Sequence, residues 1–250
     1  MNQTQALRKL VIVQIKLYLR EPLGVFFTLL FAPLLLIMMG IIFGNDPVPM
    51  FNGRGYLDVN VPSYAAIVMG MVGLLSVPIE TSTRRETGVL RRFRAAPLQP
   101  LTYIVGDVMI YFTMSILGIF LLFLLGITVY QVQFDGKLLP LMAGIFLSVA
   151  AFLALGYVIA SLAPNPRIAL LVGNVLIITM IFLSGNTLPL EIMPEIGRKI
   201  SLFNPMTHVV TLLRGLWFGD PFSKHLFEVA FLGGVLVVGT TIAAWMFRWE

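Results

Sequence analysis

Six long apolar runs dominate this 250-residue sequence and limit the folds that are open to it. A helix needs about 20 residues to cross a bilayer, because the hydrocarbon core is about 30 Å thick and each residue adds about 1.5 Å. Hydrophobic residues make up 58% of the chain and charged residues 12%, against about half and about a quarter in soluble domains. We therefore predict an all-α membrane protein with six spans, at about residues 23–43, 61–79, 101–129, 138–162, 168–183 and 227–247.

The lysine and arginine residues predict the orientation of these spans. An even number of spans places both termini on one side of the membrane, and the side richer in Lys and Arg is the cytoplasm. The termini and the connections that follow the second and fourth spans hold eleven of the 17 basic residues, and the other connections hold six. We therefore expect a multi-pass protein of the cytoplasmic (inner) membrane of a prokaryote, with both termini in the cytoplasm.

The residue types that are scarce exclude several kinds of site. The sequence has no cysteine and only two histidines, His208 and His225, which excludes a thiolate or histidine-rich metal site. It has no H-E-x-x-H, G-x-S-x-G or G-x-x-x-x-G-K-[ST] pattern, so we predict no metal, no catalytic residue and no cofactor in this chain. The net charge of +5 lies beside apolar runs, where it favours lipid headgroups and orientation over nucleic acid.

Residues 1–22 form a segment separate from the transmembrane domain, residues 23–250. Between Ala6 and Arg20, basic side chains interrupt a run of apolar ones, and Glu21-Pro22 follows. Such a run favours an amphipathic helix in the cytoplasmic headgroup layer, ended by the proline. A tail that only sets the orientation of the first span explains the pattern equally well.

Residues 80–98, between the second and third spans, form the most charged stretch of the chain. Gly88 permits a turn, Val89–Ala95 has the length of a short helix, and Pro97 ends it. A compact basic knob of this kind can dock into a cytoplasmic partner. Taken alone, the segment is explained more simply as a loop that is basic because it lies inside the cell.

Residues 186–218 belong to the last external connection and are too apolar for a solvated linker. Prolines alternate with apolar runs there, the longest of which is Met206–Phe218. Irregular backbone at membrane depth is tolerated only where it packs in protein or lines a watery cavity. We predict two short helices that dip part-way back from the outer face. The alternative is a loose extracellular loop, which would leave several aromatic side chains in water.

Two acidic residues, Glu80 and Asp107, lie within or at the end of the predicted spans, near the cytoplasmic side. An ionisable residue inside a span is a candidate for a functional site. Because a nearby arginine or headgroup water can satisfy either carboxylate, an ion pair or hydrogen bond is the simpler role. The alternative function is a self-contained ion-coupled carrier or channel that uses both residues.

Three segments, taken in chain order, resemble the type 2 ABC transporter permeases, which are the six-helix transmembrane subunits of drug, lipid and polysaccharide exporters. The first segment ends in Leu19-Arg20-Glu21-Pro22, and the second runs from Arg85 to Leu98. The third contains Leu183-Ser184-Gly185, Leu188-Pro189-Leu190, Met193-Pro194, Leu202-Phe203-Asn204-Pro205-Met206-Thr207-His208 and Leu213-Arg214-Gly215. The resemblance covers nearly the whole chain.

This resemblance implies the permease subunit of an ATP-driven exporter, paired with a second permease subunit as a homodimer or heterodimer. It also implies a separate ABC ATPase subunit that carries ATP and Mg²⁺ and receives a coupling helix from this chain. The residues implied at the ATPase interface are Glu86, Gly88, Leu90, Arg91, Arg92, Phe93, Arg94, Pro97 and Leu98. Those implied in a re-entrant exit region are Pro189, Pro194, Asn204, Pro205, His208 and Arg214.

The sequence gives two further expectations about partner and cargo. Arg91, Arg92 and Arg94 place three positive charges in the coupling segment, which departs from many members of the family and predicts an acidic docking surface. The spans consist mainly of Leu, Ile, Val, Phe and Met, with few polar groups. This composition favours an amphipathic or hydrophobic cargo, drug-like or lipid-like, over a long polar glycan.

Overall fold

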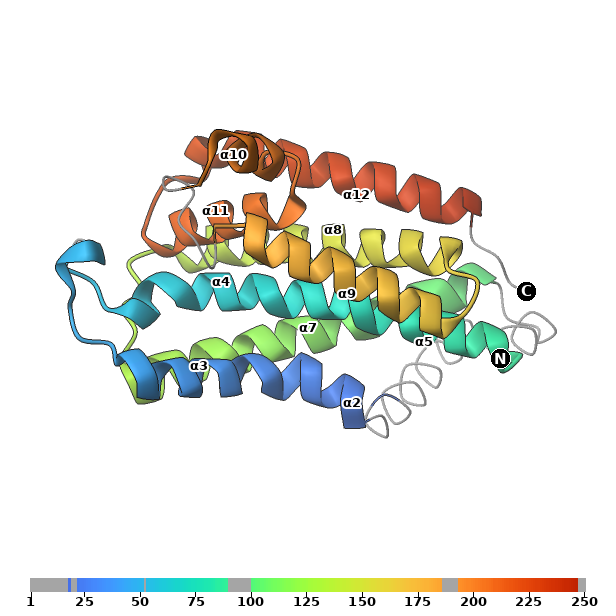
Figure 1. Cartoon of the computed structure of the whole chain (residues 1–250), viewed down its shortest axis with the longest axis horizontal. Helices are drawn as coiled ribbons and strands as arrows, with labels where there is room; N and C mark the ends of the chain where they lie inside the picture. Colours follow the sequence, from blue (N-terminus) through green and yellow to red (C-terminus); the bar gives the residue numbers. More distant parts are fainter. Residues whose placement is uncertain (1–17, 19–21, 52, 90–99, 186–192, 247–250) are drawn as a thin grey trace.

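The computed structural model is a bundle of long helices that run roughly parallel to its longest axis (Figure 1). It describes residues 18, 22–51, 53–89, 100–185 and 193–246. Within these ranges, six helices are long and apolar enough to cross a membrane: Phe26–Phe43, Tyr56–Glu86, Val105–Tyr130, Leu138–Leu162, Pro166–Leu183 and Phe222–Met246. The prediction of an all-α membrane protein with six spans is confirmed.

The first two spans each contain a π-helical turn. The first consists of η1 (Phe26–Leu30) and α3 (Phe31–Phe43) and is preceded by α2 (Pro22–Val25). The second consists of α4 (Tyr56–Met71), η3 (Val72–Ser76) and α5 (Val77–Glu86). The other long helices are α7 (Pro100–Tyr130), α8 (Leu138–Leu162), α9 (Pro166–Leu183) and α12 (Leu226–Met246). The short elements are η2 (Pro49–Phe51), α10 (Glu195–Ser201), α11 (Pro205–Trp217) and η5 (Phe222–His225).

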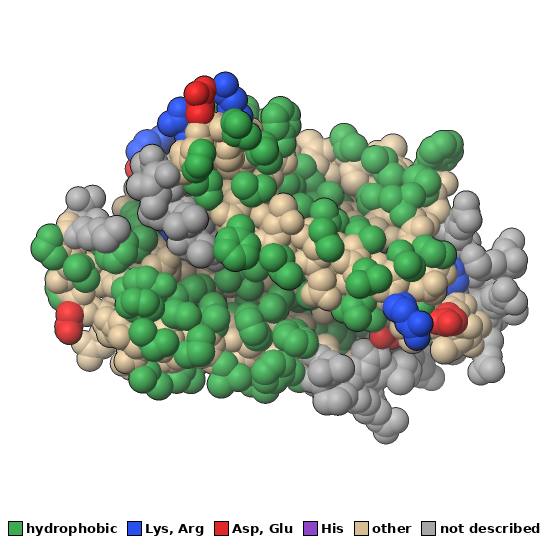
Figure 2. All heavy atoms as spheres, in the orientation of Figure 1, with side chains coloured by type: hydrophobic (Ala, Val, Ile, Leu, Met, Phe, Trp, Pro, Cys, Tyr) green, Lys and Arg blue, Asp and Glu red, His purple; other side chains and the backbone are tan. Residues whose placement is uncertain are grey.

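The bundle has two ends, which we name after one residue at each. The Arg84 end contains the last turn of α5 and lies at the right of Figure 1, and the Trp217 end lies at the left. Figure 2 shows hydrophobic side chains across the middle of one face and charged side chains mostly toward its two ends. This is the distribution expected of a bundle that crosses a membrane.

The second span lies at the centre of the bundle. In an 18-residue apolar stretch of this helix, 83% of the residues are buried. The corresponding share is 17% for α9 and 11% for the last span. The helix extends past both ends of the predicted span 61–79, because polar residues in the extensions are buried in protein. Asp58 at one end and Thr81 and Ser82 at the other are buried.

Glycines allow neighbouring helices to approach the π-helical turns at backbone distance. A Cβ added at Gly118 of α7 would lie 2.3 Å from the Thr28 carbonyl oxygen in η1. At Gly156 of α8 a Cβ would lie 2.1 Å from the oxygen of Gly73 in η3. Because no side chain fits at these points, the helix packing depends on small residues, as is typical of helices in membranes.

Candidate functional site

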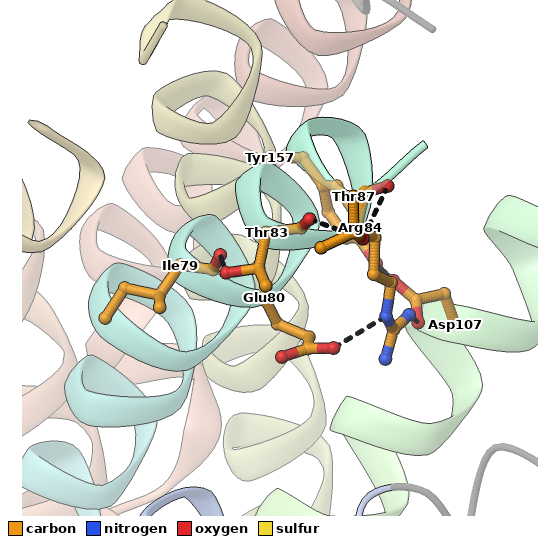
Figure 3. A network of polar contacts seen from close by, with 7 residues as sticks. All are labelled: Ile79, Glu80, Thr83, Arg84, Thr87, Asp107 and Tyr157. Carbon is orange, nitrogen blue, oxygen red and sulfur yellow. Dashed lines mark hydrogen bonds and ion pairs between the residues drawn. The ribbon is translucent and has the colours of Figure 1, made fainter. Parts of the chain in front are cut away.

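A cluster of four charged and polar side chains joins three helices at the Arg84 end (Figure 3). The Nε of Arg84 donates to Oε1 of Glu80 at 2.8 Å, and Nη1 of Arg84 donates to Oδ1 of Asp107 at 2.5 Å. Tyr157 of α8 donates its hydroxyl proton to Oδ2 of Asp107 at 2.9 Å. The Asp107 side chain is only 4% exposed. One guanidinium therefore connects α5 to α7, and the tyrosine connects α7 to α8.

The neighbouring arginine ties α5 to the end of α8. Arg85 donates from Nη1 to the Ala160 oxygen at 3.1 Å and from Nη2 to the Ala163 oxygen. The last carbonyl groups of a helix have no partners within the helix, and they carry its negative dipole charge. A guanidinium at this position donates hydrogen bonds to these carbonyl groups and pairs with the negative dipole charge. Arg84 and Arg85 together hold the end of α5 against α7 and α8.

The end of α5 leads directly into the segment that the sequence predicts to be a coupling helix. The Thr83 hydroxyl donates to the Ile79 oxygen at 2.8 Å, and the Thr87 hydroxyl donates to the Thr83 oxygen at 2.8 Å (Figure 3). Gly88 follows with φ +73, a left-handed conformation that glycine adopts without strain. Helix α5 therefore ends at Glu86, and the left-handed turn lies four residues after Arg84.

A second group of contacts fixes the position of α11. Asn204 caps this helix, because its Oδ1 accepts from the Met206 amide at 3.1 Å, and its Nδ2 donates to the Met180 oxygen at 2.9 Å. The Thr207 hydroxyl donates to the Leu183 oxygen at 3.1 Å. Pro205 occupies the first turn, where its missing N–H costs nothing. The Asn-Pro sequence thus starts α11 and anchors it to the end of α9.

Helix α11 lies inside the bundle along α4. A Cβ at Gly70 would meet Cε of Met206 at 2.6 Å, and Nη2 of Arg214 donates to the Ser63 hydroxyl at 3.0 Å. At the far end of α11, Nε1 of Trp217 donates to the Gln133 oxygen at 3.0 Å. Ten of the 13 residues of α11 are buried. Its first turn therefore lies beside the middle of the second span, and its last turn lies at the Trp217 end.

Comparison with known proteins gives the family of the chain. The family model described as ABC-2 type transporter matches residues 5–218. The chain belongs to the ABC-2 type transporter family. The resemblance inferred from the three sequence segments is therefore confirmed.

Relatives of this ABC-2 permease match it at low identity. A protein named as a transport permease, ycf38 of Cyanophora paradoxa, is 26% identical over 89% of this chain and 77% of its own length. Nodulation protein J of Rhizobium leguminosarum bv. viciae is 29% identical over 39% of this chain and 38% of its own length. The Escherichia coli K12 protein named as a multidrug ABC transporter permease, YbhR, is 22% identical over 64% and 44%. The chain thus matches less than half the length of the last two relatives.

The structure describes only some of the predicted site residues of this permease. Glu86 is the last residue of α5 and is exposed, and Gly88 lies in the turn that follows. The predicted interface residues Leu90, Arg91, Arg92, Phe93, Arg94, Pro97 and Leu98 lie outside the described residues, as does Pro189 of the predicted exit region. Of the segment 1–22, the structure describes Tyr18 and Pro22; the Tyr18 ring is buried and lies 5.9 Å from the Tyr111 ring.

The remaining exit-region residues occupy the loop before α10 and the helix α11. Pro194 immediately precedes α10 and is exposed. His208 is buried, with its Nε2 2.8 Å from the Leu202 oxygen and its ring 3.9 Å from the Phe231 ring. The Leu202 oxygen and the Phe231 ring both belong to this chain, and His208 therefore links α11 to α12 in this structure.

Asp58, which the sequence-based predictions do not include, is central to the Trp217 end. Asp58 lies inside the second span, which corrects the expectation that Glu80 and Asp107 are the acidic residues within the spans. Its carboxylate accepts from the Gly55 amide at 2.9 Å, the Gln133 amide at 3.0 Å and the Asn45 side chain at 3.0 Å. The available sequence signal is an acidic residue three positions after Gly55, because a carboxylate at this position can accept from the amide at the start of the helix, which is one half of a capping box.

Proposed function

We propose that this chain is the membrane subunit of an ATP-driven exporter of the ABC-2 family, driven by a separate ABC ATPase. The observation that carries the proposal is the cluster around Arg84. It lies four residues before the Gly88 turn, so a segment docked on an ATPase is joined by a short stretch of helix to a junction of three spans. A push on residues 86–98 would move α5, α7 and α8 together.

The direction of force transfer follows from how the cluster is built. A helix end held only by apolar contacts can slide or bend when it is pushed. Here Arg84 and Arg85 make directional bonds to Asp107 and to the last turn of α8, in a place where the guanidinium of Arg84 is largely shielded from water. Such bonds resist displacement more strongly than apolar packing does. We therefore assign the Arg84 end as the input of the transporter.

This assignment places the Arg84 end in the cytoplasm, as the distribution of basic residues predicts. The Trp217 end then faces the outside, and α11 is a helix that re-enters the bundle from the outer face. The contact between Met206 and the middle of the second span supports that depth. Gly70 lies 14 positions after Tyr56, which corresponds to about 21 Å along the helix. The location that we propose is the inner membrane of a prokaryote.

The partners and cargo are proposed on the same basis. The exposed faces of α9 and the last span, where 17% and 11% of the residues in the apolar stretch are buried, support a second permease subunit as homodimer or heterodimer. A relative named as a multidrug transporter permease supports an amphipathic or hydrophobic cargo, drug-like or lipid-like. ATP and Mg²⁺ are assigned to the ATPase partner.

The proposal is tested by reversing charge in the coupling segment. In the complex of the chain with the ABC ATPase that co-purifies with it, Arg91→Glu with Arg92→Glu should abolish transport-stimulated ATP hydrolysis without reducing membrane insertion. The matched control is Arg198→Glu, an exposed arginine of α10 near the opposite end. Normal coupling in the double variant, or an equal loss in the control, contradicts the assignment.

The alternative of an ion-coupled carrier has weaker support, because Glu80 and Asp107 both pair with Arg84. A coupling-ion site would have to separate this pairing in each cycle. The two functions differ in a simple assay with the purified chain in vesicles and no ATPase. A carrier would transport its ion, and Asp107→Asn would abolish that transport, whereas the exporter transports nothing without its ATPase.

A further inference from the structure

An apolar groove of about 560 Å³ lies between α7 and α8 toward the Trp217 end. Its volume falls within the range of about 300–1,000 Å³ that is typical of small-molecule pockets. The lining residues on α7 extend from Phe112 to Ile127, which corresponds to about 22 Å along the helix. This length exceeds the depth of one hydrocarbon leaflet, about 15 Å. The groove is therefore long enough for an extended acyl chain.

Aromatic pairs mark both ends of this groove. Phe112 and Phe146 lie with ring centroids 5.4 Å apart at one end. At the other end, Trp217 lies 4.9 Å from Phe123 and 4.9 Å from Phe134. The hydrogen bond from the indole to the Gln133 oxygen holds the tryptophan in this orientation. Aromatic side chains thus form the walls at both ends of the groove.

A positively charged residue lies next in sequence to a residue that lines the groove. Lys137 is exposed and directly precedes Leu138, whose side chain lines the groove. The acidic side chain nearest in sequence, Asp135, is paired with Arg54 at 2.7 Å. A phosphate group at this level of the membrane would meet the lysine while an alkyl chain attached to it lay in the groove. Because lipid tails and apolar side chains are equally apolar, the phosphate contact supplies the selectivity.

We propose that the groove between α7 and α8 binds one acyl chain of a phospholipid whose phosphate contacts Lys137. With the Trp217 end outside, this lipid belongs to the outer leaflet; that leaflet assignment rests on the proposed orientation, and the binding site itself does not. The lipid fills the space between two spans that the Arg84 cluster joins at their other ends, and an anionic headgroup is preferred over a zwitterionic one.

The test uses Trp217 as a reporter in the full chain. The chain has three tryptophans, so Trp245→Phe with Trp249→Phe leaves Trp217 alone. In bilayer nanodiscs, phosphatidylglycerol with brominated acyl chains quenches a tryptophan that it contacts. We expect quenching of Trp217 to saturate at a low mole fraction of brominated lipid. Trp245, which is 86% exposed and is left alone by Trp217→Phe with Trp249→Phe, reports random contact with the bilayer.

Two substitutions in the Trp217 reporter chain separate a specific site from random contact. Ile116→Phe adds bulk inside the groove and should return Trp217 quenching to the random level, whereas Ile242→Phe, on an exposed face of α12, should leave it unchanged. Lys137→Gln should raise the half-saturating fraction of phosphatidylglycerol about five-fold, the usual contribution of one lysine at an anionic surface. The same substitution should raise the half-saturating fraction of brominated phosphatidylcholine by less, because the choline group carries a positive charge next to the phosphate.

Three outcomes would overturn the proposal. Quenching of Trp217 that matches that of Trp245 at every lipid fraction indicates that no site exists. Absence of quenching, together with an oligomer size that changes in Ile116→Phe, indicates that a second copy of the chain covers the groove. Equal effects of Ile116→Phe and Ile242→Phe assign the quenching to the general lipid surface. None of these measurements depends on transport or on the ATPase. They therefore test the lipid site independently of the proposed function.

Discussion

Removing the guanidinium of Arg84 should strongly destabilise the bundle. In Arg84→Ala, Asp107 and Glu80 lose their charge partner in positions where their side chains are only 4% and 17% exposed. Breaking a buried ion pair by deleting one partner costs about 3–5 kcal/mol, because the other charge stays buried. For a chain of this size each kcal/mol lowers the unfolding temperature by about 2–4 °C. We therefore expect the apparent unfolding temperature in detergent to fall by about 6–20 °C.

Removing all three charged groups together should restore stability. In Arg84→Met with Glu80→Gln and Asp107→Asn the charged groups are gone, and most of the lost stability should return, because replacing a complete buried ion pair is often neutral. The measurement is the temperature at which the purified protein loses its monodisperse peak in size-exclusion chromatography. Arg167→Ala, an exposed arginine of α9, is the matched control. The reasoning is refuted if the triple variant is no more stable than Arg84→Ala, or if the control falls equally.

Two further variants test the packing of the bundle and the anchoring of α11. Gly156→Val should prevent stable folding, seen as aggregation on extraction, because its Cβ would lie 2.1 Å from the oxygen of Gly73; Gly233→Val, where a Cβ meets nothing within 4 Å, should behave as wild type. Asn204→Ala should lose about 2 kcal/mol, from the helix cap and the bond to Met180. A lowering of the unfolding temperature by about 4–8 °C would verify this value, and an unchanged temperature would contradict it.

The six spans could be predicted from the sequence because each apolar run is long enough to cross a bilayer by itself. The true ends of the second span could not. Asp58 and Asn60 at its start and Thr81 at its end are buried among other helices. A hydropathy scale scores every polar residue as if it were exposed to water. It does not identify a polar residue whose hydrogen bonds are made inside the protein. The most buried span is therefore the one whose ends hydropathy locates least well.

The candidate site was only partly predictable for a related reason. The spacing of Glu80 and Arg84 is that of a helical ion pair, and the sequence alone allows the inference that they meet. Asp107 lies 23 positions beyond Arg84, and Tyr157 lies 50 beyond Asp107. Only the packing of α5, α7 and α8 brings these groups together, and no local pattern marks a tyrosine as the partner of a distant carboxylate.

In the proposed transporter, residues 86–98 dock on an ATPase at the Arg84 end. Because the chain has no cysteine, a single Arg91→Cys variant carries a unique site for a photoactivated crosslinker. In the complex purified from native membranes, we predict that Arg91→Cys forms a crosslinked product with the ABC ATPase and that Arg198→Cys, in α10 near the opposite end, does not. A crosslink to the ATPase from Arg198→Cys and none from Arg91→Cys would contradict the account.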